Sequence, residues 1–162
     1  MDWAQSLRIV APEELLSTVG IILLVISAWG QGRKDARGIT WVAVLTLFIA
    51  ALMTAPALYD GVSGEAALAF GGLFSGDAFA AFTKLLIYIS AGAALLVAPA
   101  FFERYGAYRS EYPVLVLFAV LGMGIMVSAT NLLTLYVGLE LNSLSAYVLA
   151  TFLKTEDRKS VV

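Results

Sequence analysis

Long apolar runs are the feature that most limits what this chain can fold into. Residues 131–153, NLLTLYVGLELNSLSAYVLATFL, are enough to cross a bilayer and contain one charged side chain, Glu140. Counted from Leu132 at 1.5 Å per residue, Glu140 lies roughly 12 Å into a hydrocarbon layer about 30 Å thick. An acidic side chain near the centre of a membrane helix costs about 2.5–3.5 kcal/mol, so it must be protonated, paired or exposed to a water-filled cavity.

Glu140 belongs to a polar stripe on its predicted helix. The residues that share its face by helical spacing are Tyr136, Ser143 and Tyr147. Because intramembrane acids are expensive and usually mark ion pathways, we interpret Glu140 as a proton-transfer residue. The alternative is a protonated, hydrogen-bonded acid that has only a structural role.

The composition indicates an all-α integral membrane protein. Hydrophobic residues make up 60% of the 162 positions and charged residues only 14%, against roughly 25% charged residues in soluble domains. The sequence contains no Cys and no His, which excludes disulfides, Cys- or His-ligated zinc, His-ligated haem and Cys-ligated iron–sulfur clusters within it. Any redox chemistry coupled to this chain therefore takes place elsewhere.

Five apolar segments predict five transmembrane helices in a single membrane region, at about 12–30, 38–59, 77–102, 113–128 and 132–153. Pro12, followed by Glu13 and Glu14, suits the first turn of the first helix, where a fixed φ and negative charge are both favourable. The N-terminal residues are a poor cleavable signal peptide, so we expect the first segment to be retained. Residues 60–76 are too short to span and predict an interfacial or re-entrant segment.

The distribution of basic residues predicts the orientation. The first loop, the third loop and the segment after the fifth helix hold three, two and three of the ten Lys and Arg residues. By the positive-inside rule, the N-terminus is then outside and the C-terminus is cytoplasmic. Glu140 would be reached from the outer side.

Lys84 is the second charged residue inside an apolar run. It lies seven residues, or about 10 Å, along the third segment from Asp77, which is on the same helical face. We consider two interpretations equally: a functional intramembrane cation, and a lysine whose long side chain reaches back to the interface near Asp77.

Other motifs give no indication of dinucleotide binding, nucleophilic catalysis or nucleic-acid binding. Gly122-Met123-Gly124 lacks the third glycine and the strand–turn–helix setting of a dinucleotide-binding fingerprint. A Ser/His/Asp or Cys/His nucleophile set cannot form without His or Cys. The basic residues are explained by membrane topology, which leaves no indication of nucleic-acid binding.

Two stretches carry a resemblance to a known family. The fifth segment contains LYVGLELNSLSAYVL at 135–149, which resembles the fifth-helix signature of the antiporter-like membrane subunits of respiratory complex I, the proton-translocating NADH–quinone oxidoreductase. The segment SGDAFAAFTKLLIYIS at 75–90 is similar to the third helix of that family, and the following KTEDRKS resembles its cytoplasmic loop. The resemblance covers essentially the whole chain.

The resemblance implies a fold and a mechanism. The family fold has fourteen helices, including two inverted five-helix repeats with broken helices, so this chain is expected to be an N-terminal fragment that is inactive alone. Glu140 matches the glutamate that takes part in proton transfer with a lysine on a later helix. Lys84 is the weaker candidate for a catalytic role. The implied activity is proton translocation coupled to quinone reduction through a buried glutamate–lysine relay.

The resemblance also implies the surroundings of the chain. No cofactor is expected in it, while NADH, FMN, iron–sulfur clusters and quinone are expected in partner subunits. The expected partners are the lipid bilayer and other complex I membrane subunits, especially neighbouring antiporter-like and small ones. The expected location is the bacterial inner membrane, as a multi-pass protein.

Two other functions remain open from the residues themselves. A small proton-coupled exporter also uses one membrane glutamate, but familiar small multidrug transporters have four helices and carry the acid in the first. A non-transporting structural subunit is the third possibility, for which a Glu140→Gln change would affect assembly and leave transport intact.

Overall fold

Five long helices and one short hairpin form the structure, a computed structural model that describes residues 3–29, 36–62, 67–104 and 108–152. The predicted basic residues at 33–34 and in the segment 154–159 lie outside these ranges. In chain order the elements are α1 (Trp3–Trp29), α2 (Ala36–Val62), β1 (Ala67–Ala69), β2 (Phe74–Gly76), α3 (Ala78–Arg104), α4 (Glu111–Ser128) and α5 (Leu132–Phe152).

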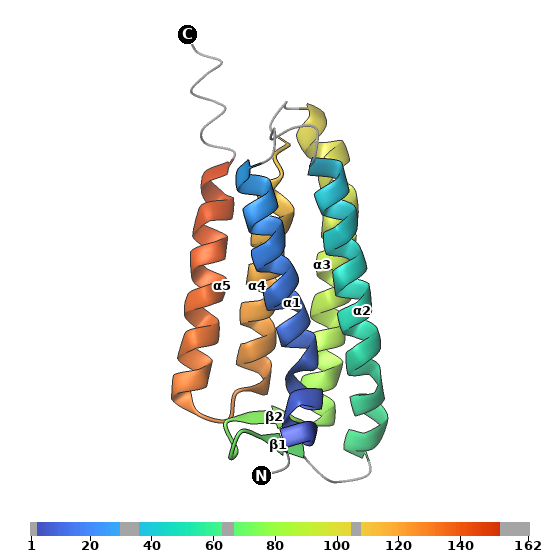
Figure 1. The fold of residues 1–162 in the computed structure, drawn as a ribbon, viewed down its shortest axis with the longest axis vertical. Helices are drawn as coiled ribbons and strands as arrows, with labels where there is room; N and C mark the ends of the chain where they lie inside the picture. Colours follow the sequence, from blue (N-terminus) through green and yellow to red (C-terminus); the bar gives the residue numbers. More distant parts are fainter. Residues whose placement is uncertain (1–2, 30–35, 63–66, 105–107, 153–162) are drawn as a thin grey trace.

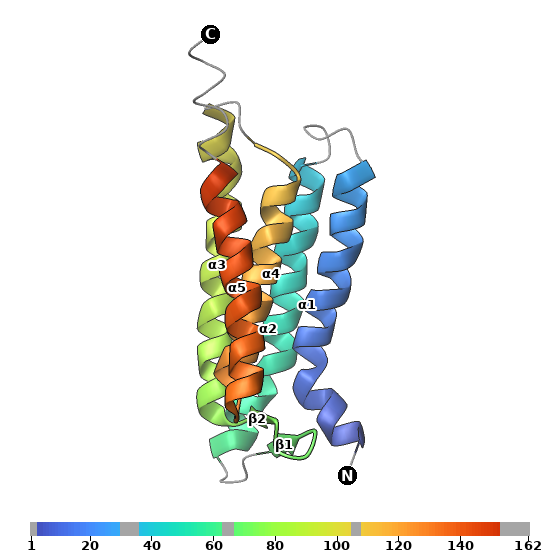
Figure 2. The same cartoon turned by 90° about the vertical axis from the view of Figure 1, so that its left-hand side faces the viewer.

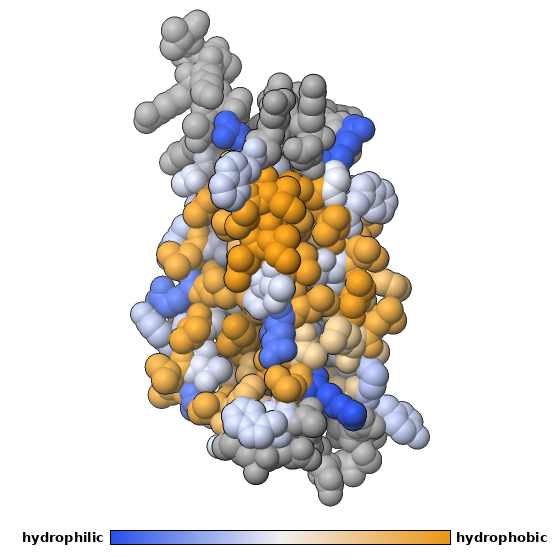
Figure 3. All heavy atoms as spheres, in the orientation of Figure 1, coloured by the Kyte–Doolittle hydropathy of each residue, from blue (hydrophilic) through white to orange (hydrophobic). Residues whose placement is uncertain are grey.

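The five helices run side by side along one axis (Figures 1 and 2). Each is long and apolar enough to cross a membrane, which confirms the predicted all-α membrane fold with five spanning helices. Helices suit these sequences because lipid offers no partner for backbone polar groups, and a helix satisfies them within the segment. The face in Figure 3 is accordingly mostly hydrophobic along the middle of the bundle.

The first helix begins earlier than its sequence predicts. It starts at Trp3, so Pro12 lies inside it and the segment before Pro12 is helical as well. This extra part packs on the hairpin, where the Phe70 amide donates to Ser6 Oγ at 3.5 Å and the Trp3 and Phe70 rings meet edge to face. As a result Glu13 lies within the bundle, and not at a helix end.

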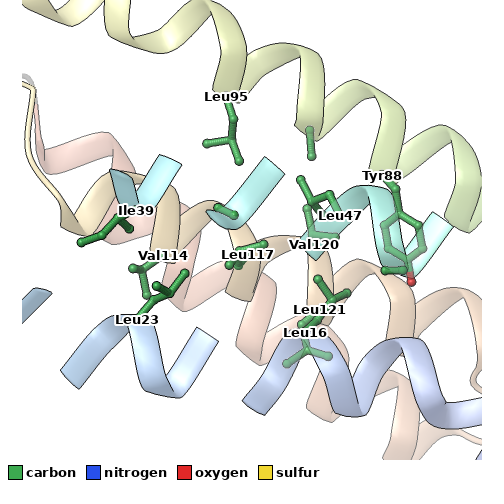
Figure 4. Packing of buried hydrophobic residues seen from close by; sticks show 13 residues of the cluster. Leu16, Leu23, Ile39, Leu47, Tyr88, Leu95, Val114, Leu117, Val120 and Leu121 are labelled. Atoms are coloured by element: carbon green, nitrogen blue, oxygen red, sulfur yellow. The ribbon is translucent and has the colours of Figure 1, made fainter. Parts of the chain in front are cut away.

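The core is made by α1 to α4, with α4 in contact with all four other helices. Figure 4 shows the side chains that meet between these helices: Leu16, Leu23, Ile39, Leu47, Tyr88, Leu95, Val114, Leu117, Val120 and Leu121. By contrast, only 11% of the α5 span is buried, against 44% of the α4 span. Helix α5 is therefore attached to the bundle mainly along one side.

The hairpin closes the end of the bundle at which α1 begins (Figure 1). Its turn has positive φ at Phe70, Gly71 and Gly72. The Thr130 side chain and amide bond to the Gly72 and Leu73 carbonyls, which ties the turn to the connection between α4 and α5. Of the segment 60–76, predicted as interfacial or re-entrant, residues 60–62 end α2 and residues 67–76 form a small antiparallel hairpin, while residues 63–66 lie outside the described ranges.

Helices α4 and α5 approach so closely that their backbones touch. A Cβ atom built on Gly138 would lie 2.8 Å from the Gly122 carbonyl oxygen and 2.9 Å from the Met126 amide nitrogen. A Cβ on Gly122 would lie 2.6 Å from the Asn142 amide nitrogen. These distances are too short for real contacts, so both positions require glycine. Small residues at helix interfaces allow this kind of approach in membranes.

Replacing Gly138 by alanine should therefore separate α4 from α5. We expect the midpoint of heat unfolding of the complete protein in detergent to fall, with a loss of about 1–3 kcal/mol typical of an overpacked interior. Gly92→Ala is the matched control, because a Cβ there meets nothing within 4 Å. Equal midpoints for the two variants would contradict the close approach.

Candidate functional site

Lys84 and Glu13 form an ion pair inside the bundle. Lys84 Nζ lies 2.6 Å from Glu13 Oε1, and the two residues are 3% and 4% exposed. The ammonium group also lies over the Phe74 ring, 4.8 Å from its centroid. Removing one partner of a buried pair typically costs about 3–5 kcal/mol, because the other charge is left uncompensated.

The pair joins two helices that otherwise meet little. Helix α1 packs mainly on α2 and α4, and helix α3 likewise packs on α2 and α4. Glu13 comes from α1 and Lys84 from α3, so their contact crosses the interior of the bundle. The pair therefore fixes the position of α1 against α3.

One of the two interpretations of Lys84, a side chain that reaches back to the interface near Asp77, is wrong. Asp77 precedes α3 and caps it, since Asp77 Oδ1 accepts a hydrogen bond from the Ala80 amide at 2.7 Å. Ser75 Oγ donates to its other carboxylate oxygen at 3.3 Å. Lys84 instead turns into the bundle, where Glu13 compensates its charge. The interpretation of Lys84 as a functional intramembrane cation stays a prediction.

Sequence reasoning missed Glu13. Pro12 and two acids in succession are typical of a helix start, but here the helix begins nine residues earlier. The signal that was available is periodicity: Glu13 shares one buried stripe of α1 with Leu16, Gly20, Leu23 and Ser27. Its neighbour Glu14 lies off this stripe and is exposed.

Glu140 lies in a different environment. It is half-buried, its polar neighbour on the same helical face is Tyr136, and the described residues supply it with no ion pair. Gly138, which touches α4, is about 200° away around the helix. The polar stripe predicted for Glu140 therefore faces away from α4. Tyr136 and Tyr147 on that stripe are 59% and 70% exposed.

Helix α4 separates Glu140 from the ion pair. Gly122 faces α5, whereas a Cβ on Gly124 would lie 3.3 Å from Glu13 Oε1. Two residues along a helix correspond to a rotation of about 200°, so these glycines face opposite sides. Both charged sites lie roughly 10–15 Å along their helices from the hairpin end. The Gly-Met-Gly sequence thus serves helix packing on two faces.

The described residues contain no group of three acidic side chains able to hold a metal ion. The chemistry within reach of these side chains is proton transfer, because the acidic and basic side chains within the middle of the described spans are Glu13, Glu14, Lys84 and Glu140. The sequence proposed two site residues, Glu140 and Lys84. The structure does not bring them into contact with each other.

Comparisons with known proteins agree on one family name. The chain is 52% identical over 160 residues to NADH-quinone oxidoreductase subunit N of Erythrobacter litoralis (strain HTCC2594), which covers 99% of this chain and 33% of that protein. The subunit N of Rhizorhabdus wittichii is 51% identical over 161 residues, covering 99% of this chain and 32% of the relative. That of Sphingopyxis alaskensis is 47% identical over 154 residues, covering 95% and 31%. No family model matches the chain.

The chain spans about a third of the length of the curated relatives that it matches. Nearly every described residue therefore has a counterpart in these relatives, while about two thirds of each relative has none in this sequence.

Proposed function

Because the chain is similar over nearly its whole length to a part of NADH-quinone oxidoreductase subunit N, we propose that it works within the membrane part of a proton-translocating NADH–quinone oxidoreductase. Glu140 is the residue that takes up and releases the translocated proton. Its partner is a lysine from the portion of subunit N that this sequence does not cover. Electron transfer from NADH through FMN and iron–sulfur clusters to quinone belongs to other subunits.

The observation that carries the proposal is the direction of the Glu140 stripe. A carboxylate at this depth needs a partner or water, and within the described fold it has only Tyr136. The stripe lies on the least buried helix and on the side of it opposite α4. Additional helices of the subunit are the natural source of the missing cation.

The relay works through the distance between the two charges. A nearby ammonium favours the ionised carboxylate, and removing the ammonium favours the protonated one. Movement of the lysine, driven by quinone reduction elsewhere in the complex, then changes the proton affinity of Glu140.

Lys84 is a candidate of a different kind. Its ammonium is already paired with Glu13 inside the described bundle, so Glu13 is the proton acceptor that lies beside it there. We assign the pair a first role in holding α1 against α3. A part in proton transfer stays a prediction.

The proposed location is the bacterial inner membrane. The positive-inside rule supports an orientation in which the end bearing the hairpin faces outward and the opposite end faces the cytoplasm. The proposed partners are other membrane subunits of the complex, including neighbouring antiporter-like subunits.

Purification of the complete protein from its source membranes tests this assignment. An affinity-tagged protein should carry with it an assembly that oxidises NADH and reduces quinone. A protein purified from the same membranes without such activity, while the activity itself remains in other fractions, would contradict the proposal. Substrate-dependent proton release by that purified protein would favour an exporter instead.

A further inference from the structure

Helix α5 packs against little of the described bundle. Among the described helices, α4 is the one that packs extensively against it, and the α5 span is the least buried of the five. The closest part of this contact is at Gly138, which meets the backbone of α4 and lies two residues before Glu140. A single line of contact with one helix leaves α5 able to turn and tilt around it. A second attachment is needed to fix the direction in which Glu140 faces.

That second attachment is the hairpin between α2 and α3. The connection from α4 to α5 is joined to it at two successive residues, Ala129 and Thr130. Ala129 forms a β-bridge with Phe74. The Thr130 amide donates a hydrogen bond to the Leu73 carbonyl oxygen at 3.4 Å, and the Thr130 hydroxyl donates to the Gly72 carbonyl oxygen. Thr130 thus supplies both a backbone and a side-chain bond to the turn.

The hairpin in turn is held by two helices that α5 does not pack on extensively. On the α1 side, the Phe70 amide donates to Ser6 Oγ at 3.5 Å. On the α3 side, the Phe74 ring is 6% exposed and lies under the Lys84 ammonium. Strand β2 also passes directly into α3 through Asp77, which caps that helix. The position of the turn is therefore set by α1 and α3, and Thr130 passes this position on to α5.

Helix α5 is continuous from this attachment to Glu140. Asn131 follows Thr130 and caps the helix, with its side chain accepting a hydrogen bond from the Thr134 amide at 2.8 Å. The helix then runs from Leu132 to Phe152 and contains no proline. Ten residues separate Thr130 from Glu140, or about 15 Å along the helix. A continuous helix turns and tilts as one unit, so a change at its first residues also moves Glu140.

We infer that Thr130 is a positioning residue for Glu140, because its two bonds to the hairpin fix the rotation and tilt of α5. The inference rests on the proposed role of Glu140 in proton transfer. Proton transfer requires the two groups to be within hydrogen-bond reach of each other. A misplacement of about 1 Å can lower the rate of such a step by roughly 10²-fold. Loss of the Thr130 attachment should therefore slow proton transfer at Glu140 without any change in Glu140 itself.

Thr130→Val in the complete complex tests this inference. Valine has nearly the same shape and keeps the amide bond to Leu73, but it loses the hydroxyl bond to Gly72. The number of protons translocated per NADH oxidised should fall, and the carboxyl C=O band of Glu140 in the infrared difference spectrum should shift. Thr130→Ser keeps the hydroxyl and should restore both. Thr83→Val is the matched control, because its hydroxyl donates to the Phe79 carbonyl oxygen of its own helix, and it should resemble the wild type.

Gly72→Ala disturbs the same bond from the hairpin side. Gly72 has a φ of 91°, which residues with a side chain rarely adopt, and a Cβ there meets nothing within 4 Å. Alanine should therefore displace the Gly72 carbonyl by backbone strain and not by overpacking. This variant should shift the Glu140 band in the same way as Thr130→Val, and it decides the matter if Thr130→Val does not assemble.

The position of the Glu140 band separates a positioning role from a structural one. A smaller amount of complex with an unshifted band would mean that Thr130 only stabilises the fold, and would overturn the inference. An unshifted band and an unchanged proton ratio in both variants would overturn it too, while leaving the proton-transfer role of Glu140 intact. If the wild-type spectrum contains no band that depends on Glu140, the proposed function itself fails, and the inference fails with it.

Discussion

Replacing Glu140 by glutamine should abolish the contribution of this subunit to proton translocation in the assembled complex. Glutamine has nearly the same shape as glutamate and remains polar beside Tyr136, so the local packing is preserved. It cannot bind and release a proton at neutral pH, and the relay is therefore interrupted at this point. Proton transfer by a positioned side chain speeds a reaction about 10²–10⁴-fold. The rate of proton transfer through Glu140 should fall by a factor of this size.

The measurement is the number of protons translocated per NADH oxidised by the complex in sealed vesicles. The ratio should fall in Glu140→Gln and should be partly kept in Glu140→Asp, which retains a carboxylate. Glu14→Gln is the matched control, since Glu14 is an exposed acid of the same subunit. A Glu140→Gln complex that assembles and keeps the wild-type ratio would refute the proton-transfer role.

Breaking the ion pair between Glu13 and Lys84 should cause the largest loss of stability among single substitutions in the bundle. Lys84→Met leaves a carboxylate without its cation, and Glu13→Leu leaves an ammonium without its anion. Each should lower the free energy of unfolding by about 3–5 kcal/mol. The double variant Glu13→Leu/Lys84→Met should recover most of this loss, because apolar replacement of a complete buried pair is often neutral or stabilising.

The amount of assembled complex in the membrane and its heat-unfolding midpoint measure these effects. Glu14→Gln again provides the control, because it changes the neighbouring acid without touching the pair. If the losses of the two single variants simply add in the double variant, the two side chains do not act as a pair. Recovery in the double variant, together with a lowered proton ratio, would assign the pair a part in translocation as well.

The sequence was sufficient to predict the parts of the fold that depend only on residues close together in the chain. Apolar length predicts the five helices, since lipid forces each long apolar segment to satisfy its own backbone. Asn131, a residue type common at the N-cap, caps α5 by accepting a hydrogen bond from the Thr134 amide at 2.8 Å. Helical periodicity likewise places Tyr136 and Glu140 on one face.

The sequence was not sufficient where residues far apart in the chain decide the outcome. Glu13 is buried because α1 begins at Trp3 and because α3 presents Lys84 to it, and neither fact is local to Pro12. Glycines at 122, 124 and 138 are visible in the sequence, but which of them meets a backbone and which meets a carboxylate depends on the packing of three helices. Asp77 was the nearer partner for Lys84 along the chain, and it caps a helix instead.

The most direct test of the central claim is an infrared difference spectrum of the complete complex, recorded before and after NADH is added. If Glu140 gains or loses a proton during turnover, the wild-type spectrum should contain a carboxyl C=O band that is missing in Glu140→Gln and present in Glu14→Gln. Identical carboxyl bands in the wild type and in an active Glu140→Gln complex would contradict the claim that Glu140 carries the proton.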